Sequence, residues 1–288
     1  MSRLAERPTA LRHFQALGCH CEILLDGAGE RAPELFEIAR HEAERIESKF
    51  SRYRSGTVID RVNAGRGEPI VVDAETADLL DYAARCYEFS DGLFDVTTGA
   101  LRKVWRFEEG SISVDDAELA EARRHIGWHH VRWERPVLRM PKGFELDFGG
   151  IGKEYAADRI LQRIRERTQA SVLVNLGGDI AAAGTRVWSV GIENPIRASE
   201  LIATIQLRAG AVATSGTAKR FATVQGRKLG HILNPKTGWP APDAPLSVTV
   251  TGQTCTEAGF WSTLAMLQGG RAEAFLAEQR LESWCCRE

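Results

Sequence analysis

Segments with strand periodicity and segments with helix periodicity follow one another in this chain without a regular βαβ rhythm. The opening segment of roughly residues 15–25 alternates apolar and polar side chains, as a half-buried strand does. The next segment instead repeats apolar residues at a helical period, at Leu35, Ala39 and Ala43. Irregularly interspersed strands and helices are typical of α+β proteins rather than of doubly wound sheets. We therefore predict an α+β fold with mixed or antiparallel sheets flanked by helices.

The same two periodicities place the other elements. Asp73 is a suitable N-cap for a helix that runs through Leu79, Leu80 and Ala83. Further strand segments, some interrupted by glycine turns, are predicted over residues 130–134, 136–140, 144–148, 172–184, 188–193, 200–216 and 246–252. Further helices are predicted over residues 152–167, 257–268 and 271–283.

Length and the absence of repeats favour one domain. The chain has 288 residues, which is ample for a substantial hydrophobic core. It shows no repeat of fixed period and no linker that would force two separable domains. We expect residues 1–13 to form an N-terminal extension and residues 14–288 to form one domain of two lobes.

Charge and composition exclude several classes of function. The net charge is −2, so nothing in the balance indicates a nucleic-acid partner or an anionic membrane. No run of about 18 apolar residues occurs, which argues against a transmembrane helix. The N-terminal residues lack the apolar region of a signal peptide, so a cytoplasmic location is predicted unless an export signal has been removed.

The six cysteines form no CxxC pair, and free thiols are expected. Cys19-His20-Cys21 offers potential metal ligands, but the alternation of ALGCHCEILLDG favours a strand over a zinc site.

The strongest local signal is ELDFGGIGKEYAADRI, residues 145–160, in which a strand ending at Asp147 passes through glycines into a helix. Glycines at such a turn let backbone amides approach an anion, and the helix N-terminus adds partial positive charge. Lys153 could add a full charge. The spacing matches neither the dinucleotide fingerprint nor the P-loop, so phosphate binding and a tight turn with a solvated lysine both stay open.

Several other turn segments carry polar or aromatic residues, and for each of them a structural role is the simpler interpretation when it is taken alone. No acid and histidine pattern around Ser215 matches a hydrolase triad, and GxSxG is absent. The segments are Gly177-Gly178 before Asp179, Thr214-Ser215-Gly216, His231 ahead of the turn at Asn234, Phe94 in DGLFDVTTG, and Tyr53 in a polar stretch.

Seven blocks follow one another along the chain: FSRYRSGTVIDRVN, DGLFDVTTGAL, LDFGGIGKEYAAD, VNLGGDIAAAG, ATSGTAKRF, HILNPKTG and EAGFWSTLAMLQG. Together and in this order they resemble the ApbE family, the FAD:protein FMN transferases, over roughly residues 14–270. The resemblance implies an enzyme that splits FAD at its pyrophosphate. It would then move FMN onto a threonine hydroxyl of a target flavoprotein as a phosphoester, assisted by Mg2+.

The resemblance also implies roles for individual residues. His231 and Thr263 would take part in catalysis. Asp147 would hydrogen-bond FAD, Lys153 would lie near the flavin or its phosphate, and Leu17 stands where the family often has methionine. The full set expected to bind FAD is Leu17, Tyr53, Leu93, Phe94, Asp95, Asp147, Lys153, Gly177, Gly178, Thr214, Ser215, Gly216 and Ile232. The positions expected at the metal are Gly150, through its carbonyl, Gly259 and Thr263.

The chain departs from the family pattern at the expected metal site. The closing pattern Ala-Asp-Ala-x-x-Thr reads Ala258-Gly259-Phe260-Trp261-Ser262-Thr263, so glycine replaces the metal-binding aspartate. Glu257 is the nearest substitute in sequence but would face elsewhere on a helix, while Asp179 or Asp243 could reach in from loops. Other departures are Phe260 for a small residue, Asn234 and Thr217 for aspartates, and Glu154 for glycine.

Three functions are compatible with these departures. The first is an FMN transferase that uses Mg2+ through Thr263, backbone carbonyls and a replacement acid. The second is an FAD- or FMN-binding protein that has lost magnesium-dependent transfer, and the third is a scaffold that has lost flavin as well. Cleavage of FAD that depends on Mg2+ distinguishes the first from the second.

Overall fold

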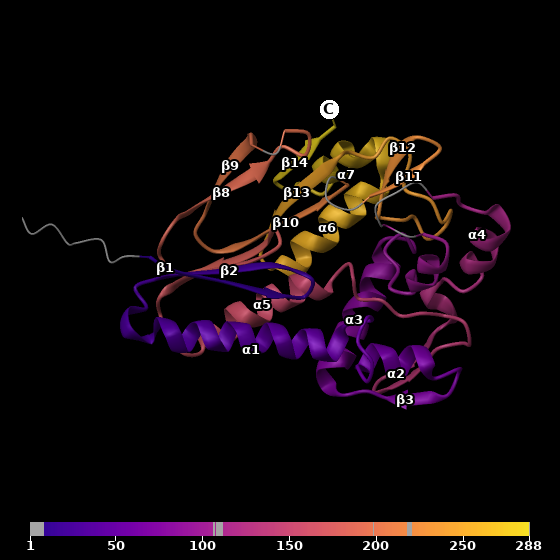
Figure 1. Ribbon diagram of the computed structural model, residues 1–288, viewed down its shortest axis with the longest axis horizontal. Helices are drawn as coiled ribbons and strands as arrows, with labels where there is room; N and C mark the ends of the chain where they lie inside the picture. Colours follow the sequence, from indigo (N-terminus) through magenta and orange to yellow (C-terminus); the bar gives the residue numbers. More distant parts are fainter. Residues whose placement is uncertain (1–8, 106, 108–111, 198, 218–220, 288) are drawn as a thin grey trace, which may run out of the picture. The chain divides into compact units, whose positions relative to one another are not determined.

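The computed structural model describes residues 9–105, 107, 112–197, 199–217 and 221–287 (Figure 1). Most of the predicted N-terminal extension, residues 1–8, lies outside these ranges, and the first strand begins at Ala10. The chain divides into two compact units. The first comprises Met1–Glu47, Ile151–Thr214 and Thr249–Gly259, and the second comprises Ser48–Gly150, Ser215–Val248 and Phe260–Glu288.

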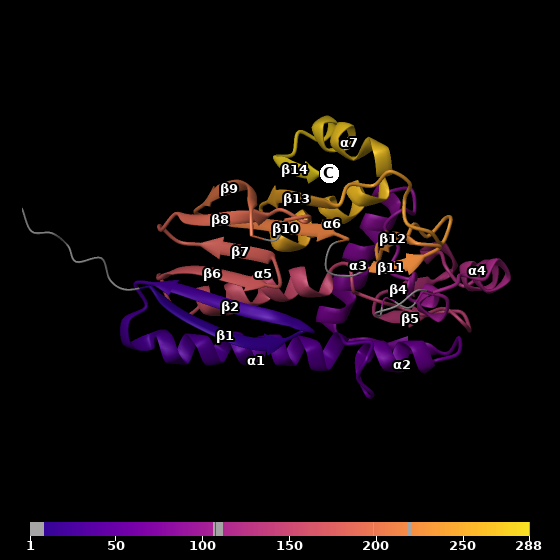
Figure 2. The ribbon, with the colours of Figure 1, turned by 45° about the horizontal axis from the view of Figure 1, so that its top comes forward.

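The largest sheet has seven strands in the order β1-β2-β6-β7-β10-β13-β14 (Figure 2). The pairs β1–β2, β2–β6, β6–β7 and β7–β10 are antiparallel, and together with the helices they give the predicted α+β fold. The strands are β1 (Ala10–Ala16), β2 (Cys19–Asp26), β6 (Ser171–Leu176), β7 (Asp179–Ala183), β10 (Gly210–Gly216), β13 (Ser247–Gly252) and β14 (Ser283–Cys286).

Two hairpins of this sheet close through two-residue turns. Leu17 and Gly18 join β1 to β2 with φ values of 56° and 68°, and Gly177 and Gly178 join β6 to β7 with φ values of 69° and 104°. Positive φ at both positions matches the right-handed twist of the flanking strands. Glycine adopts it without a steric penalty, which explains GG in VNLGGD.

Two helices of the first unit lie along this sheet, α1 (Ala32–Phe50) beside β1 and β2, and α5 (Gly152–Arg165) against β6 and β7 (Figures 1 and 2). The predicted helical stripe Leu35, Ala39 and Ala43 is fully buried, as are alternate residues of β2 such as Ile23. Burying a stripe of one element against one face of another is the standard solution for an amphipathic helix. The hairpin β8 (Trp188–Glu193) and β9 (Leu201–Leu207) completes the first unit.

The second unit holds shorter elements around its own core. Asp73 caps α3 as predicted, because its side chain accepts hydrogen bonds from the backbone N–H groups of Glu75 and Thr76. One apolar cluster of this unit includes Leu101, Trp105 and Leu119. The elements are α2 (Val58–Ala64), α3 (Ala74–Phe89), α4 (Asp116–Arg123), α7 (Ala272–Glu278), a sheet of β3 (Pro69–Val71), β5 (Val137–Arg139) and β4 (Arg132–Glu134), and a hairpin of β11 (Phe221–Val224) and β12 (Arg227–Gly230).

Two predicted elements were wrong. Residues 144–148 form no strand beyond an isolated bridge between Glu145 and Thr98. The side chain of Asn63 accepts from the Leu146 N–H and donates to its carbonyl, so an amide side chain replaces a partner strand there. The helix predicted over residues 271–283 ends at Glu278, because Arg280 adopts a left-handed φ of 57°, and β14 follows.

All six cysteines carry free thiols, as predicted. Across the ranges the structure describes, no helix is both long enough and apolar enough to cross a membrane.

Candidate active site

The start of α5 places two charged side chains of the first unit side by side. Lys153 donates a hydrogen bond through Nζ to the Asp179 carboxylate at the start of β7. The Asp179 side chain is nearly inaccessible, whereas that of Lys153 is 35% exposed. Burial disfavours the charge of Lys153, but the neighbouring carboxylates outweigh it and raise the pKa of the ammonium. Lys153 is therefore held charged in a fixed direction.

Glu154, the next residue of α5, points inward and is only 7% exposed. Its Oε2 atom is buried and has no hydrogen-bond partner among the described residues. Burial raises the pKa of Glu154 to about 7, the Asp179 charge adds to this effect, and the Lys153 charge opposes it. A buried carboxylate oxygen without a partner is costly, so a group that supplies positive charge would be stabilised there.

Glu154 fills the space beside Gly259 of α6 (Cys255–Leu267). A Cβ atom added at Gly259 would lie 2.5 Å from the Glu154 Cγ and 3.2 Å from its Cδ. A side chain at position 259 and the glutamate at position 154 therefore cannot coexist without movement. The chain carries a carboxylate in this space, but the carboxylate comes from α5 rather than from α6.

The other acids near the start of α6 are occupied by capping. Asp158 of α5 accepts hydrogen bonds from the N–H groups of Cys255 and Thr256 and from the Thr256 hydroxyl. Glu257 accepts from the Gln253 N–H, while its own N–H donates to the Thr254 hydroxyl. This reciprocal exchange is a form of capping box and satisfies amides that the helix leaves unpaired. Glu257 is thus engaged as a cap.

Turning to the second unit, Asp147 is paired with Arg52, whose Nη1 atom donates to its Oδ2 atom. Arg52 also donates to the Tyr53 hydroxyl at 2.8 Å, and its guanidinium lies 4.9 Å from the centre of the Tyr53 ring. Tyr53 itself is 71% exposed. Sequence reasoning singled out Asp147 and Tyr53 but missed the arginine that links them, although it stands next to Tyr53 in FSRYRSG.

Aromatic side chains of the second unit cluster around Phe260. Its ring lies edge-on to Phe94 at 5.3 Å and to Phe89 at 6.0 Å, and it contacts Trp261 at 5.1 Å. Phe94 and Phe260 are buried, while Phe89 is 58% exposed. A Cβ atom at Gly150 would lie 3.4 Å from the Phe94 ring, so glycine leaves this aromatic surface open beside the backbone.

The neighbouring Asp95 is a structural anchor in this arrangement. Its carboxylate accepts from the N–H and hydroxyl of Thr97 and from the N–H of Trp128. Burial raises the pKa of Asp95, and these hydrogen bonds oppose the rise. The carboxylate therefore fixes the turn that carries Leu93 and Phe94.

Hydroxyl groups gather where β10 ends. In the second unit, Ser215 lies within hydrogen-bond distance of Ser262 and Thr263, at 2.9 Å and 3.0 Å between hydroxyl oxygens. In the first unit, the Thr214 and Thr249 hydroxyls are 2.8 Å apart. Gly216 passes close to another strand segment, because a Cβ atom there would lie 3.0 Å from the Leu246 carbonyl oxygen.

His231 and Ile232 lie in the loop after β12, and both are half-buried. The His231 ring is edge-on to Phe107, with 6.2 Å between ring centres. Asn234 begins the following turn, where its side chain accepts from the Lys236 N–H and its backbone carbonyl accepts from the Gly238 N–H. The position predicted for an aspartate thus serves as a turn-forming asparagine.

A family model described as "ApbE family" matches residues 17–285. The chain belongs to the ApbE family. An FAD:protein FMN transferase of Klebsiella pneumoniae is 29% identical over 257 residues, covering 81% of this chain and 78% of that relative. One from Treponema pallidum is 30% identical, covering 77% of this chain and 68% of the relative. The crystal structure of the ApbE protein from Thermotoga maritima matches with a TM-score of 0.89 and 29% identity, covering 96% of this chain and 94% of that one.

In this ApbE-family chain, the predicted site residues fall into local groups. In the first unit, Lys153 lies beside Asp179, and Glu154 beside Gly259. In the second unit, Gly150 lies beside Phe94, and Ser215 beside Thr263. The functional candidates missed from the sequence are Arg52, Glu154 as a carboxylate donor, and Ser262.

Oxygen donors of the kind that a magnesium ion takes occur in each unit of the ApbE-family chain. Mg2+ prefers oxygen ligands and commonly uses one or two carboxylates together with phosphates of the substrate. In the first unit, Glu154 offers a buried carboxylate oxygen that has no partner among the described residues. In the second unit, Thr263 offers a hydroxyl.

Proposed function

We propose that this ApbE-family protein is an FAD:protein FMN transferase. The observation that carries the proposal is the similarity to curated FAD:protein FMN transferases along most of the chain, as in the relative from Klebsiella pneumoniae. The acceptor would be a flavoprotein with a target threonine. Its identity and the cytoplasmic location remain predictions of the sequence.

The reaction transfers a phosphoryl-linked flavin. The threonine oxygen of the acceptor forms a bond to the phosphorus of the FMN half of FAD, and the bond from that phosphorus to the bridging oxygen breaks. AMP leaves with the bridging oxygen, and the threonine proton is released to a base. Such displacements depend chiefly on positioning and on compensation of negative charge.

The charged and aromatic groups suit the two ends of FAD. We assign Lys153 to the pyrophosphate, because its ammonium is held charged by Asp179. Asp147 and Arg52 offer hydrogen bonds to the polar edge of the flavin, and Phe94 offers an apolar surface to its ring. We place the nucleotide half near Thr214, Ser215, Gly216, His231 and Ile232.

We further propose that Glu154 replaces the aspartate that the family pattern places at Gly259. The support is local: Glu154 fills the space beside Gly259, and its Oε2 atom has no hydrogen-bond partner in the part of the chain that the structure describes. The other metal positions that the family pattern implies, Thr263 and the Gly150 carbonyl, belong to the second unit and stay predictions of the sequence. When bound, the ion would neutralise charge on the pyrophosphate oxygens.

The direct test is FAD turnover by the purified protein with Mg2+ and with EDTA. We expect AMP to be released in the presence of Mg2+, and a threonine-containing acceptor to gain the mass of FMN. EDTA should abolish both signals. Binding of FAD without any AMP release under these conditions would contradict the transferase and favour the alternative, an FAD- or FMN-binding protein without transfer.

Substituting Thr263 with valine tests the hydroxyl ligand. Thr263→Val keeps the side-chain volume but removes the oxygen, so we expect the Mg2+ concentration for half-maximal turnover to rise by roughly tenfold. Thr204→Val, at an exposed position of β9, is the matched control and should leave it unchanged. An unchanged magnesium requirement in Thr263→Val would remove Thr263 from the metal site.

A further inference from the structure

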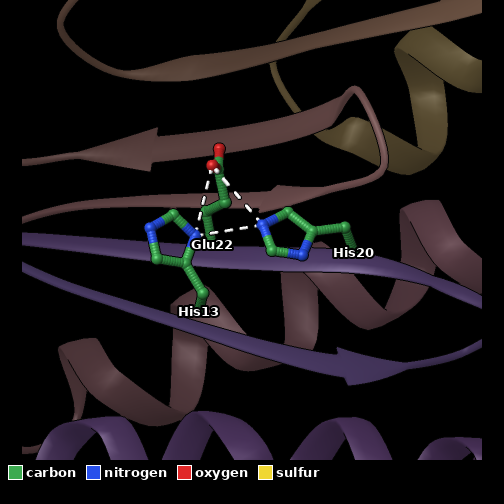
Figure 3. A group of neighbouring side chains, drawn as sticks. All are labelled: His13, His20 and Glu22. Atoms are coloured by element: carbon green, nitrogen blue, oxygen red, sulfur yellow. Dashed lines mark hydrogen bonds and ion pairs between the residues drawn. The ribbon is translucent and has the colours of Figure 1, made fainter.

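Three side chains of the first two strands form a cluster that the proposed transfer reaction does not use. His13 lies on β1, and His20 and Glu22 lie on β2 (Figure 3). His13 is directly opposite Glu22 in the strand register, and His20 is two residues before Glu22. Because side chains alternate along a strand, all three project from the same face of the sheet. Cys21 and Ile23 are buried on the other face.

The three ligand-type atoms converge on one point. The His13 Nδ1 atom is 3.0 Å from the His20 Nε2 atom and 3.3 Å from the Glu22 Oε1 atom. The His20 Nε2 atom is 3.8 Å from the same carboxylate oxygen. A tetrahedral ion with bonds of about 2.1 Å separates its ligand atoms by about 3.4 Å. The observed triangle therefore has the size of one face of such a tetrahedron.

Hydrogen bonds alone satisfy this triangle poorly. In a neutral imidazole, a given ring nitrogen either donates or accepts. A proton on His13 Nδ1 can point to His20 or to Glu22, and the remaining lone pairs then face each other without a proton between them. A single cation at the centre would engage all three lone pairs together.

The carboxylate is oriented from behind by a third strand. Asn175 of β6 donates from Nδ2 to the Glu22 Oε2 atom at 2.8 Å. The oxygen of the same amide accepts from the Gly178 N–H at 2.8 Å, which fixes the amide orientation. Glu22 thus turns its other oxygen, Oε1, towards the two imidazoles. Partners of this kind, which hold a ligand in place, are characteristic of built metal sites.

Gln15 contacts the His20 ring on the side away from the cluster. Its Nε2 atom lies 3.1 Å from His20 Nδ1, the ring nitrogen that does not face the cluster. A flip of this amide, which exchanges its nitrogen and oxygen, would let Gln15 accept a proton from Nδ1 and leave the Nε2 lone pair of His20 for a metal.

We propose that His13, His20 and Glu22 bind one zinc ion. Two imidazoles and one carboxylate suit a first-row transition metal of this class and not Mg2+, which prefers oxygen ligands. The His13 and His20 side chains are 48% and 52% exposed, so the fourth position is open to water or to a ligand from another molecule. This site is independent of the magnesium site and does not rest on the transferase function.

The test measures zinc binding by the full chain after removal of metals with EDTA. We expect one Zn2+ per chain in equilibrium dialysis, undisturbed by millimolar Mg2+. His20→Ala should weaken binding by at least tenfold, and Asn175→Ala by about tenfold, because loss of a supporting partner alone has that effect. Substitution with Co2+ should give the intense absorption bands of a tetrahedral ion, and His20→Ala should abolish them.

His41→Ala provides the matched control. His41 is also exposed and lies 3.9 Å from a glutamate, Glu37, but among the described residues it belongs to no group of three potential metal ligands. The substitution His41→Ala should leave zinc affinity unchanged. Wild-type affinity in both His13→Ala and His20→Ala would overturn the proposal. Loss of zinc from the variant Cys285→Ser/Cys286→Ser, with retention in His20→Ala, would likewise overturn it and assign the metal to the C-terminal thiols.

Discussion

The double variant E154G/G259D is expected to bind Mg2+ within about threefold of wild type, whereas E154G or G259D alone binds it at least tenfold more weakly. E154G removes the carboxylate that lies in the space beside position 259. G259D keeps Glu154 but adds a Cβ atom at 2.5 Å from the Glu154 Cγ and a second negative charge. Overpacking of this kind typically destabilises a protein by about 1–3 kcal/mol.

In the double variant, each substitution compensates for the effect of the other. The aspartate introduced at position 259 would provide the carboxylate from α6, and the glycine introduced at position 154 would vacate the volume that this carboxylate needs. The comparison is a double-mutant cycle, in which the two effects must be strongly non-additive if both side chains serve one place. G259D alone restores the aspartate of the family pattern, but its contact with Glu154 means that it should not improve Mg2+ binding.

Binding of Mn2+, followed by electron paramagnetic resonance, measures the site without requiring turnover. Glu257→Gln is the control, because Glu257 is occupied in capping α6 and should not influence metal affinity. If E154G/G259D were no better than the weaker single variant, Glu154 would not be the replacement ligand. FAD turnover of the four proteins then reports separately on the transferase.

Removing the ammonium of Lys153 should lower the free energy of unfolding substantially. Lys153→Met keeps much of the side-chain volume but leaves Asp179 and Glu154 without their cation. Breaking a fully buried ion pair costs about 3–5 kcal/mol. Because Lys153 is 35% exposed, solvent moderates the loss, and we expect about 2 kcal/mol at pH 8 without FAD.

The stability that Lys153→Met loses should depend on pH, and the direction of this dependence follows from Glu154. Glu154 has a pKa of about 7 in the folded protein and an ordinary value of 4.5 when it is solvated. The folded state therefore retains a proton that the unfolded state releases, and stability falls as the pH rises from about 4.5 to about 7. Since Lys153 lowers the pKa of Glu154, its removal moves the upper end of this window above 7. The difference in free energy of unfolding between wild type and Lys153→Met should therefore be largest at pH 8 and smallest at pH 5.

Urea unfolding at pH 5, 6, 7 and 8 measures this difference. Lys236→Met is the control, because Lys236 pairs with Asp91 on the surface, where both side chains are more than half exposed. Its effect should stay below about 1 kcal/mol at every pH. A constant difference between wild type and Lys153→Met over this range would rule out Glu154 as the responsible group.

Much of the fold follows from local patterns in the sequence. The period of α1, the Asp73 cap of α3 and the glycine turn between β6 and β7 are each specified by residues close in the chain. Residues 144–148 misled the prediction because Asn63, far away in sequence, provides the hydrogen bonds that a partner strand would have provided. Period alone carries no information about such distant partners.

The candidate site also contains residues that the sequence predicts and residues that only the structure reveals. The order of the motifs predicted Lys153, Asp147 and Thr263, but nothing in the sequence relates the departures at Glu154 and Gly259 to each other. Only the structure shows that they share one volume, because they are about a hundred residues apart in the chain. The triangle of His13, His20 and Glu22 does not follow from the sequence, because it depends on the pairing register that sets His13 of β1 opposite Glu22 of β2.

The cap that Asp158 places on α6 has an evolutionary consequence. It ties the beginning of α6 to α5, so two neighbouring backbones keep a constant separation at positions 154 and 259. A functional group can then migrate from one backbone to the other while its place in space is preserved. Aligned residue by residue, such a migration is indistinguishable from decay, and enzymes that have merely relocated a ligand would be counted among the inactive members of their families.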